Sequence, residues 1–285
     1  MRSPIIRLTV APVLLLACLV VLQCGQVDRQ TTSRPYLILF AFDAEGEFLS
    51  EQMSVSKVEK HLGRAVAIGE LSGKAVVLAE SGIGMTNAAM TAQKLIDLYA
   101  PRAVIMTGIA GGIDTTVHIG DIVACDAWMQ HDYGYVGADG FEHMELYAYI
   151  PGDDSLAGMV AFEADSALLS AAVRVTGEQL DLEQIGERTP SIHVGGIGVT
   201  GNTFIDSEEK RQWLSDEFGA LVTDMESAAV AHACTVNGVP FIIFRSASDL
   251  AGGSGSETAE EELEEFFEVA ADNSGQVVIS FLREL

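Results

Sequence analysis

The sequence predicts a single α/β domain in which helices flank a mainly parallel, twisted central sheet. Three observations lead to this prediction. Short runs rich in Val, Ile and Leu alternate with helical stretches over residues 36–285, these runs are apolar at successive positions, and neither a linker nor an internal repeat divides them. Strands that are apolar on both faces and alternate with helices are typical of a parallel sheet covered on two sides. A chain of this length is sufficient for one large domain.

The expected strands are the short apolar runs, namely Tyr36–Phe42, Lys74–Glu80, Ala103–Thr107, Ile122–Cys125, Ser191–Val199 and Phe241–Ser246. The expected helices are the stretches between and after them, namely Met85–Tyr99, Leu168–Thr176, Glu208–Phe218, Met225–Asn237 and Glu260–Leu282. Gly108–Gly112, with three glycines in five residues, is expected to be a turn or a point of close backbone approach. In such sheets ligands bind at the carboxyl ends of strands, so polar residues that follow strands are site candidates.

Residues 1–24 are predicted to be a processed secretory signal. Arg2 and Arg7 precede the apolar run Leu8–Leu22, which is shorter than the ~20 residues of a membrane-spanning helix. A polar tether, residues 25–35, follows. An uncleaved membrane anchor is the alternative interpretation.

The four cysteines fall into two groups. Cys18 and Cys24 lie near the end of the apolar run, and either is a candidate for the lipidated first residue of a bacterial lipoprotein. The protein is therefore expected to be exported, either to the periplasm or to a membrane through an N-terminal lipid. Cys125 and Cys234 have apolar neighbours and are expected to be buried free thiols, since nothing around them has metal-ligand spacing.

The charge and the first glycine motif exclude several classes of ligand. A formal net charge of −25 disfavours nucleic acid and anionic membranes as partners. The turn Ser81-Gly82-Ile83-Gly84 superficially resembles a dinucleotide-binding loop, but the third glycine of that motif is replaced by Asn87. We therefore expect neither a cofactor nor a metal.

Two polar segments follow late strands of the predicted sheet. Asp224-Met225-Glu226 precedes a helix of small residues, and Arg245-Ser246-Ala247-Ser248-Asp249 ends a strand. Taken singly, a carboxylate before a helix complements the helix dipole, and Arg245 with Asp249 is compatible with a structural ion pair.

Together with the other motifs, these segments resemble a known family. Residues 36–282 are similar to the 5′-methylthioadenosine/S-adenosylhomocysteine nucleosidases, which belong to the same superfamily as the nucleoside phosphorylases. The matching segments are Ala41–Glu45, Ser81–Gly84, Thr107–Gly112, Gly120–Val123, Val199–Ile205, Asp224–Glu226, Ala231–Cys234, Val239–Phe241 and Arg245–Asp249. The resemblance implies a nucleoside phosphorylase-like fold and hydrolysis of the N-glycosidic bond of a 5′-thio-substituted adenosine, with release of adenine.

The resemblance also implies roles for residues on the purine side. Asp249 would protonate the purine at N7, for which its pKa must be raised by burial. Ser248 would orient the Asp249 carboxyl group. Phe204 would stack on the purine, and the backbone of Ile205 would contact the edge of the base.

On the sugar side the resemblance implies a second set of roles. Glu45 would hold the attacking water with help from Arg245, and Glu226 would accept hydrogen bonds from both ribose hydroxyls. Met225 and Phe42 would pack on the sugar. Cleavage builds positive charge on the ribose, so an acid at the base and carboxylates at the sugar match the chemistry.

The chain departs from the family pattern at three places. Ile109 stands where a small hydroxyl residue usually helps to hold the water, and Asn202 replaces an aspartate of the purine-side loop. A longer acidic segment, Ala251–Glu262, precedes Leu263, which stands where the family commonly has an aromatic residue. Both a mobile cover over the substrate and a solvated acidic loop are compatible with this segment.

Two other functions remain open. A phosphate-dependent purine nucleoside phosphorylase would use an arginine where the chain has Met106, so hydrolysis is preferred. An exported nucleoside-binding protein with weakened catalysis would account for Ile109. The family is commonly dimeric, and Gln130–His143 is the candidate for a loop that completes a partner's site in a homodimer.

Overall fold

In the computed structural model, both faces of the central sheet are buried, because alternate residues of its strands enter different hydrophobic cores. In β1 (Tyr36–Phe40), Leu37 and Leu39 pack into one core, whereas Ile38 and Phe40 pack into the other. The first core contains residues of α2 (Met85–Tyr99) and α5 (Ser227–Asn237). The second contains residues of α1 (Asp43–Gln52), α3 (Ser166–Val175) and α6 (Ala259–Glu284).

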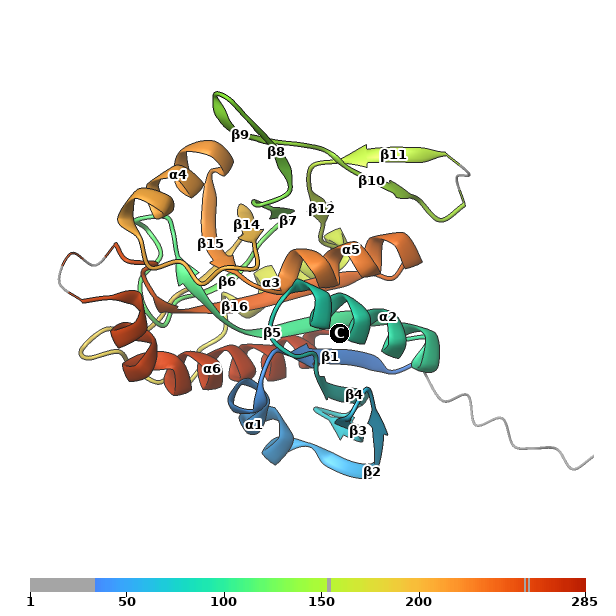
Figure 1. Cartoon of the computed structure of the whole chain (residues 1–285). Coiled ribbons are helices and arrows are strands. Elements are labelled where there is room, and N and C mark those ends of the chain that lie inside the picture. The colour runs from blue at the N-terminus through green and yellow to red at the C-terminus, as the bar shows by residue number, and fades with distance from the viewer. Residues whose placement is uncertain (1–33, 153–154, 254, 256) are drawn as a thin grey trace, which may run out of the picture. The chain divides into compact units, whose positions relative to one another are not determined.

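The structure describes residues 34–152, 155–253, 255 and 257–285 (Figure 1). They belong to one compact unit, Ser33–Leu285. The predicted signal, residues 1–24 with Cys18 and Cys24, and positions 25–33 of the predicted tether lie outside the described residues. Within the described part of the chain, no helix has the length and apolar character to cross a membrane.

The centre of the sheet is parallel, as predicted. β16 (Phe241–Asp249), β5 (Ala103–Gly112), β1 and β4 (Lys74–Glu80) lie side by side in this order. A second parallel set consists of β7 (Ala127–Gln130), β14 (Ile197–Thr200) and β15 (Ala220–Asp224), and β15 pairs antiparallel with the end of β5. The margins β2 (Ser54–His61), β3 (Arg64–Leu71) and β12 (Phe162–Glu163) pair antiparallel. β6 (Ile122–Ala124) pairs antiparallel with β16 and parallel with β13 (Ile192–Val194). The sheet is therefore mixed, with a parallel centre.

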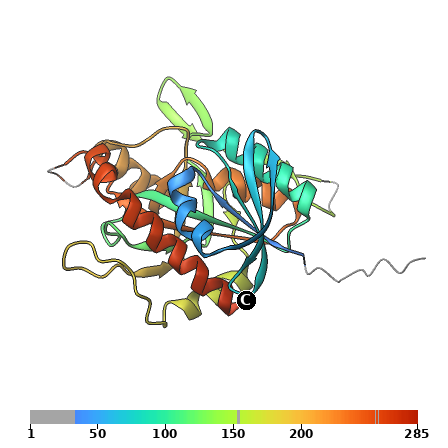
Figure 2. The same cartoon turned by 90° about the horizontal axis from the view of Figure 1, so that it is seen from below.

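The helices form a layer on each side of this centre. α2 packs against α5 on one side, and α1 packs against α6 on the other (Figures 1 and 2). α6 begins at a capping box in which Thr258 and Glu261 exchange side chain to backbone hydrogen bonds. α4 (Glu208–Phe218) packs beside β15. Cys125 and Cys234 are buried free thiols, as predicted.

Several predicted strand boundaries are wrong. β1 ends at Phe40 instead of Phe42, and β16 continues past Ser246 to Asp249. β5 does not end at Thr107 but continues to Gly112, because the glycine segment pairs with β16 and β15 instead of turning. The predicted strand Ser191–Val199 is two short strands, β13 (Ile192–Val194) and β14. Between them Gly195 and Gly196 adopt φ angles of 116° and 79°, which glycine reaches without strain.

Other elements were not predicted. β2 is almost entirely exposed, so its sequence lacks the apolar pattern of the central strands. α1 lies directly after β1 and is polar on most of its surface. An arm of two hairpins stands away from the sheet (Figure 1). The arm consists of β8 (Gly134–Gly137), β9 (Gly140–His143), β10 (Leu146–Tyr149) and β11 (Leu156–Met159).

Candidate active site

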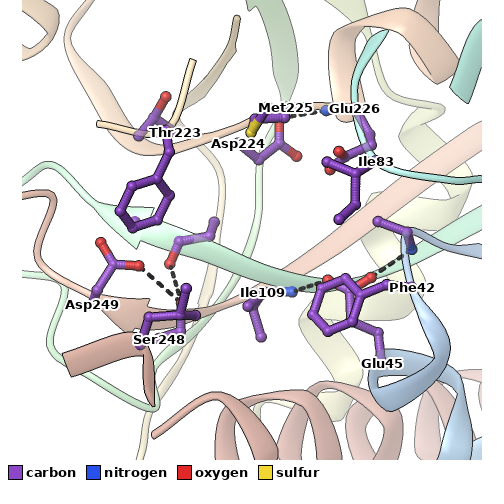
Figure 3. Close-up of a pocket in the computed structure, with 15 residues that line it drawn as sticks. Phe42, Glu45, Ile83, Ile109, Thr223, Asp224, Met225, Glu226, Ser248 and Asp249 are labelled. Carbon is purple, nitrogen blue, oxygen red and sulfur yellow. Dashed lines mark hydrogen bonds between the residues drawn. The ribbon is translucent and has the colours of Figure 1, made fainter. Parts of the chain in front are cut away.

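A cavity of about 260 Å³ lies where β1, β5, β15 and β16 end (Figure 3). Eight of the predicted site residues line it: Phe42, Glu45, Ile109, Phe204, Met225, Glu226, Ser248 and Asp249. Ile205 borders a small adjoining cavity together with Phe204 and Asp249. Arg245 lies buried beside the cavity and contacts its carboxylates. The structure thus brings all ten predicted residues to one place.

Asp249, the last residue of β16, is a buried carboxyl group with few polar partners. Only 2% of its surface is exposed. Ser248 Oγ donates to its Oδ2 at 2.9 Å, and the backbone N–H of Ala251 donates to its Oδ1 at 2.8 Å. Burial raises the pKa of Asp249 to about 6, although both hydrogen bonds oppose this change. The residue therefore holds a proton more readily than an ordinary aspartate, as a general acid requires.

Arg245 is fully buried on β16 and faces three carboxylates. Its Nε lies 2.8 Å from Asp224 Oδ2, its Nη2 3.1 Å from Glu226 Oε2, and its Nη1 3.4 Å from Glu45 Oε1. Asp224 was not predicted as a site residue. It ends β15, and Thr200 Oγ1 also donates to its Oδ1 at 2.5 Å. Asp224 therefore fixes the guanidinium from behind, while the other two nitrogens point at Glu45 and Glu226.

Glu45 is held in the first turn of α1 by two backbone donors. The N–H of Ile109 donates to Oε1 at 2.8 Å and the N–H of Ala41 donates to Oε2 at 2.5 Å. Burial raises the pKa of Glu45, and the charge of Arg245 opposes this. Gly108 makes this approach possible, since a Cβ there would lie 2.2 Å from Glu45 Oε1 and 2.4 Å from Arg245 Nη1. The glycine segment thus serves close approach rather than a turn.

Glu226 stands at the start of α5 and connects the two sides of the cavity. The backbone N–H of Gly84 donates to its Oε1 at 2.7 Å, so the turn before α2 is tied to it. Burial raises the pKa of Glu226 to about 7, against the effect of Arg245, and the nearby charge of Asp224 raises it further. One arginine therefore does not neutralise the three carboxylates around it.

Comparisons with known proteins agree with this geometry. The sequence profile of the phosphorylase superfamily matches residues 35–283. The 5′-methylthioadenosine/S-adenosylhomocysteine nucleosidase of Tolumonas auensis is 34% identical over 249 residues, which cover 87% of this chain and 98% of that protein. The chain belongs to this nucleosidase family of the phosphorylase superfamily.

Solved structures of similar proteins extend the comparison. The Neisseria meningitidis nucleosidase in complex with methylthio-immucillin-A has a TM-score of 0.72 and 30% identity, covering 88% of this chain and all of that one (100%). The Colwellia psychrerythraea nucleosidase in complex with adenine has a TM-score of 0.73 and 32% identity, covering 88% and 96%. Futalosine hydrolase of Helicobacter pylori also matches, with a TM-score of 0.73, 26% identity, and coverage of 88% and 98%.

The departures from the nucleosidase pattern have defined places in the structure. The Ile109 side chain lines the cavity next to Glu45, so no hydroxyl is offered there. Asn202 Oδ1 accepts a hydrogen bond from the N–H of Met85 at 3.0 Å, which ties the purine-side loop to the start of α2. Leu263 of α6 also lines the cavity. The acidic segment before it is anchored, because Ala259 N donates to Asp206 Oδ1 at 2.9 Å.

Several lining residues had no predicted role. Ile83 and Asp224 belong to motifs of the sequence and Thr223 precedes one, but nothing in the sequence indicated that their side chains border the cavity. The loop Gln130–His143 does not line the cavity within this one chain. Among the described residues, no three His, Cys, Asp or Glu side chains are grouped as a metal site would require.

Proposed function

We propose that this protein hydrolyses the N-glycosidic bond of a 5′-thio-substituted adenosine and releases adenine. This proposal is supported best by the placement of two different kinds of side chain on opposite sides of one cavity. Asp249, a buried acid with a raised pKa, stands on one side, and the carboxylates of Glu45 and Glu226 with Arg245 stand on the other. Relatives that align over nearly their full length carry the name of this activity.

On the purine side, Asp249 supplies the proton. As the bond between C1′ and N9 breaks, its electron pair moves into the purine ring, and N7 takes the proton of the Asp249 carboxyl group. Ser248 holds this carboxyl group at 2.9 Å, so that its orientation is set before the substrate binds. Phe204 lines the cavity and is 45% exposed, so its ring is placed to cover the base.

On the sugar side, the carboxylates stabilise the positive charge that develops on the ribose. Glu226 accepts hydrogen bonds from the ribose hydroxyls, and Glu45 accepts a proton from the attacking water as its oxygen bonds to C1′. Arg245 orients both carboxylates. Because the arginine does not neutralise all three acids, the site favours a cationic transition state over the neutral substrate.

The borders of the cavity fit an apolar 5′ substituent. Phe42, Ile83, Ile109 and Leu263 contribute hydrocarbon surface, and none of the described lining residues is a Lys, Arg or His. A thioether is therefore better matched than a charged group.

The function is tested by following free adenine from methylthioadenosine, with and without inorganic phosphate, using Asp249→Asn as the inactive control. We expect release that does not depend on phosphate. Strict dependence on phosphate would instead make the protein a phosphorylase. Binding without release would make it a nucleoside-binding protein.

We also propose a homodimer in which the β8–β9 hairpin contacts a second copy. Val136 is 75% and Tyr135 59% exposed, and Phe141 lies on the paired strand. Exposed apolar groups of this kind are typical of interfaces. Light scattering should give the mass of two chains, and Val136→Asp should lower it toward one; a wild-type monomer would exclude this arrangement.

We further propose that the protein is exported and that residues 1–24 are its signal. Arg2 and Arg7 before the apolar run Leu8–Leu22 support this. The intact mass of the protein from a bacterial host should lack the signal and, with a lipid, show a diacylglycerol adduct that Cys24→Ser or Cys18→Ser abolishes. An unprocessed N-terminus would contradict export.

A further inference from the structure

The first turn of α6 contains three consecutive glutamates in three different environments. Glu260 is exposed, and Glu261 completes the capping box with Thr258. Glu262 instead turns inward, and only 3% of its surface is exposed. A buried carboxylate is costly unless it is paired, so its surroundings indicate what it does.

The partner of Glu262 is the backbone that follows Asp249. The N–H of Leu250 donates to Glu262 Oε2 at 2.8 Å, and the next N–H, that of Ala251, donates to Asp249 Oδ1 at 2.8 Å. Two successive amides of one turn are thus bound by two carboxylates. Ala251 adopts a φ of 52°, which is strained for a residue with a side chain, and the turn therefore depends on such bonds.

Glu262 also remains without a neutralising cation. None of the ion pairs recorded among the described residues includes it. Its charge therefore acts on its neighbour, and Glu262 raises the pKa of Asp249, as does Asp206 from the loop before α4. From the strands, β15 contributes Asp224, whose charge is paired with Arg245.

Arg211 of α4 adds one cation to this corner. Its Nε donates to the carbonyl of Gly112 at 3.1 Å. Asp249 is thus surrounded by two carboxylates without an ion pair among the described residues, one carboxylate paired with an arginine, and one arginine bound to a backbone carbonyl. In this order, they are Glu262 and Asp206, Asp224, and Arg211.

We propose that Glu262 is a positioning residue of this site, which fixes the turn after Asp249 and sets the charge environment of that carboxyl group. The inference rests on the proposed function, in which Asp249 must arrive protonated. It assigns a role to the acidic segment that distinguishes this chain from the family pattern. Glu262 does not line the cavity and acts through Asp249.

The test is the pH profile of kcat/KM for adenine release by Glu262→Gln, with Glu260→Gln as the matched control. Gln keeps an oxygen that accepts from Leu250 N but removes the charge, so the pKa of Asp249 falls. The alkaline limb of the kcat/KM profile should move to lower pH by about one unit. Below that limb, where Asp249 is protonated in both proteins, the rates should agree within about twofold. Glu260→Gln should leave the profile in place.

A superimposable profile for Glu262→Gln and the wild type would overturn the proposal. If Glu262→Gln does not fold, Asp206→Asn provides the second variant, because it removes the other charge while retaining an oxygen for Ala259 N. Its profile should move in the same direction, and no movement would again contradict the account.

A second readout separates this proposal from the proposed function. Calorimetric binding of adenine as a function of pH reports the protonation of Asp249 without turnover, and its alkaline limit should fall in Glu262→Gln. A wild type that binds adenine but releases none from the nucleoside refutes the hydrolase. An active wild type with unmoved profiles in the variant refutes only the positioning role.

Discussion

The cluster around Asp121 and the candidate active site each pair buried carboxylate with an arginine, and they differ in the number of carboxylates for each arginine. In the first, Asp121 is the single carboxylate. Arg188 Nη2 donates to both of its oxygens at 2.5 and 2.6 Å, and the N–H groups of Ser191 and His118 donate at 2.6 and 3.0 Å. Burial disfavours the charged form of Asp121, but the hydrogen bonds from Arg188 and the two N–H groups outweigh this effect. The pKa of Asp121 is therefore lowered.

The second cluster is the candidate active site, where Arg245 faces three carboxylates. Burial dominates there, and the pKa values of Glu45 and Glu226 are raised. The comparison indicates that burial alone does not decide whether a carboxylate is structural or catalytic. The number of carboxylates that share one arginine differs: Arg188 serves Asp121 alone and fastens a loop to β6, whereas Arg245 is shared by three carboxylates, an arrangement that suits a cationic transition state.

The largest expected effect separates the two clusters by activity. Glu45→Gln should lower kcat by about 10²–10⁴-fold, because the attacking water loses its base. Asp121→Asn should leave kcat within about threefold, because its cluster does not touch the cavity. Steady-state kinetics of adenine release measure both. Equal losses in the two variants would remove the distinction.

The next effect separates them by stability at pH 7. Asp121→Asn should lower the free energy of unfolding by about 1–3 kcal/mol, because Arg188 and the N–H groups lose their charged acceptor. Glu226→Gln should be neutral or stabilising, because it reduces the repulsion among three carboxylates. Urea unfolding of the two variants beside the wild type gives both values. A destabilised Glu226→Gln would mean that Arg245 needs all three partners.

The pH dependence of stability should have opposite signs in the two clusters. Glu226 has a folded-state pKa of about 7, above its ordinary 4.5, so the folded state retains its proton. Its contribution to stability is present below pH 4.5 and is lost as the pH rises through 7. Asp121 has a lowered pKa, so its contribution is present above the ordinary value of 3.8 and is lost as the pH falls through the folded value.

Unfolding measured from pH 3 to pH 8 tests these signs. Glu226→Gln should flatten the decline between about pH 4.5 and pH 7, and Asp121→Asn should flatten only the acid side. If both variants changed the same part of the curve, the two clusters would not differ in the sense argued above.

The smallest expected effect concerns Ile109, which lines the cavity beside Glu45 and offers no hydroxyl group. Ile109→Ser should raise kcat by about three- to tenfold, because one added hydrogen bond would help Glu45 to hold the water. Ile109→Val, which adds no hydroxyl, is the control. A rise in the Val variant, or a fall in the Ser variant, would show that the isoleucine contributes through packing instead.

The sequence predicted those features that local patterns encode. Strands buried on both faces, such as β1 with Leu37 and Ile38 entering different cores, have an unmistakable apolar composition. The edge strand β2 has none, because exposed positions accept any polar residue. Gly108 is visible in the sequence, but the sequence does not distinguish a glycine that the close approach of Glu45 and Arg245 requires from one that a turn requires.

The candidate site was predicted because short motifs that follow strands resemble those of the nucleosidase family, and two of the residues that this resemblance missed share one property. Asp224 and Glu262 are acidic residues in a chain with 41 of them, so their composition distinguishes nothing. Their partners are Arg245 on another strand and the backbone of Leu250, and only the folded chain brings these together.

The central claim is that the carboxylates around Arg245 exclude phosphate, so that water attacks the sugar. It is tested most directly by identifying the sugar that is released when phosphate is abundant. A site in which Arg245 is already surrounded by Asp224, Glu226 and Glu45 repels an anion. Mass spectrometry of the products from methylthioadenosine in phosphate buffer should therefore find free 5-methylthioribose in an amount equal to adenine. A 5-methylthioribose 1-phosphate product would contradict the account.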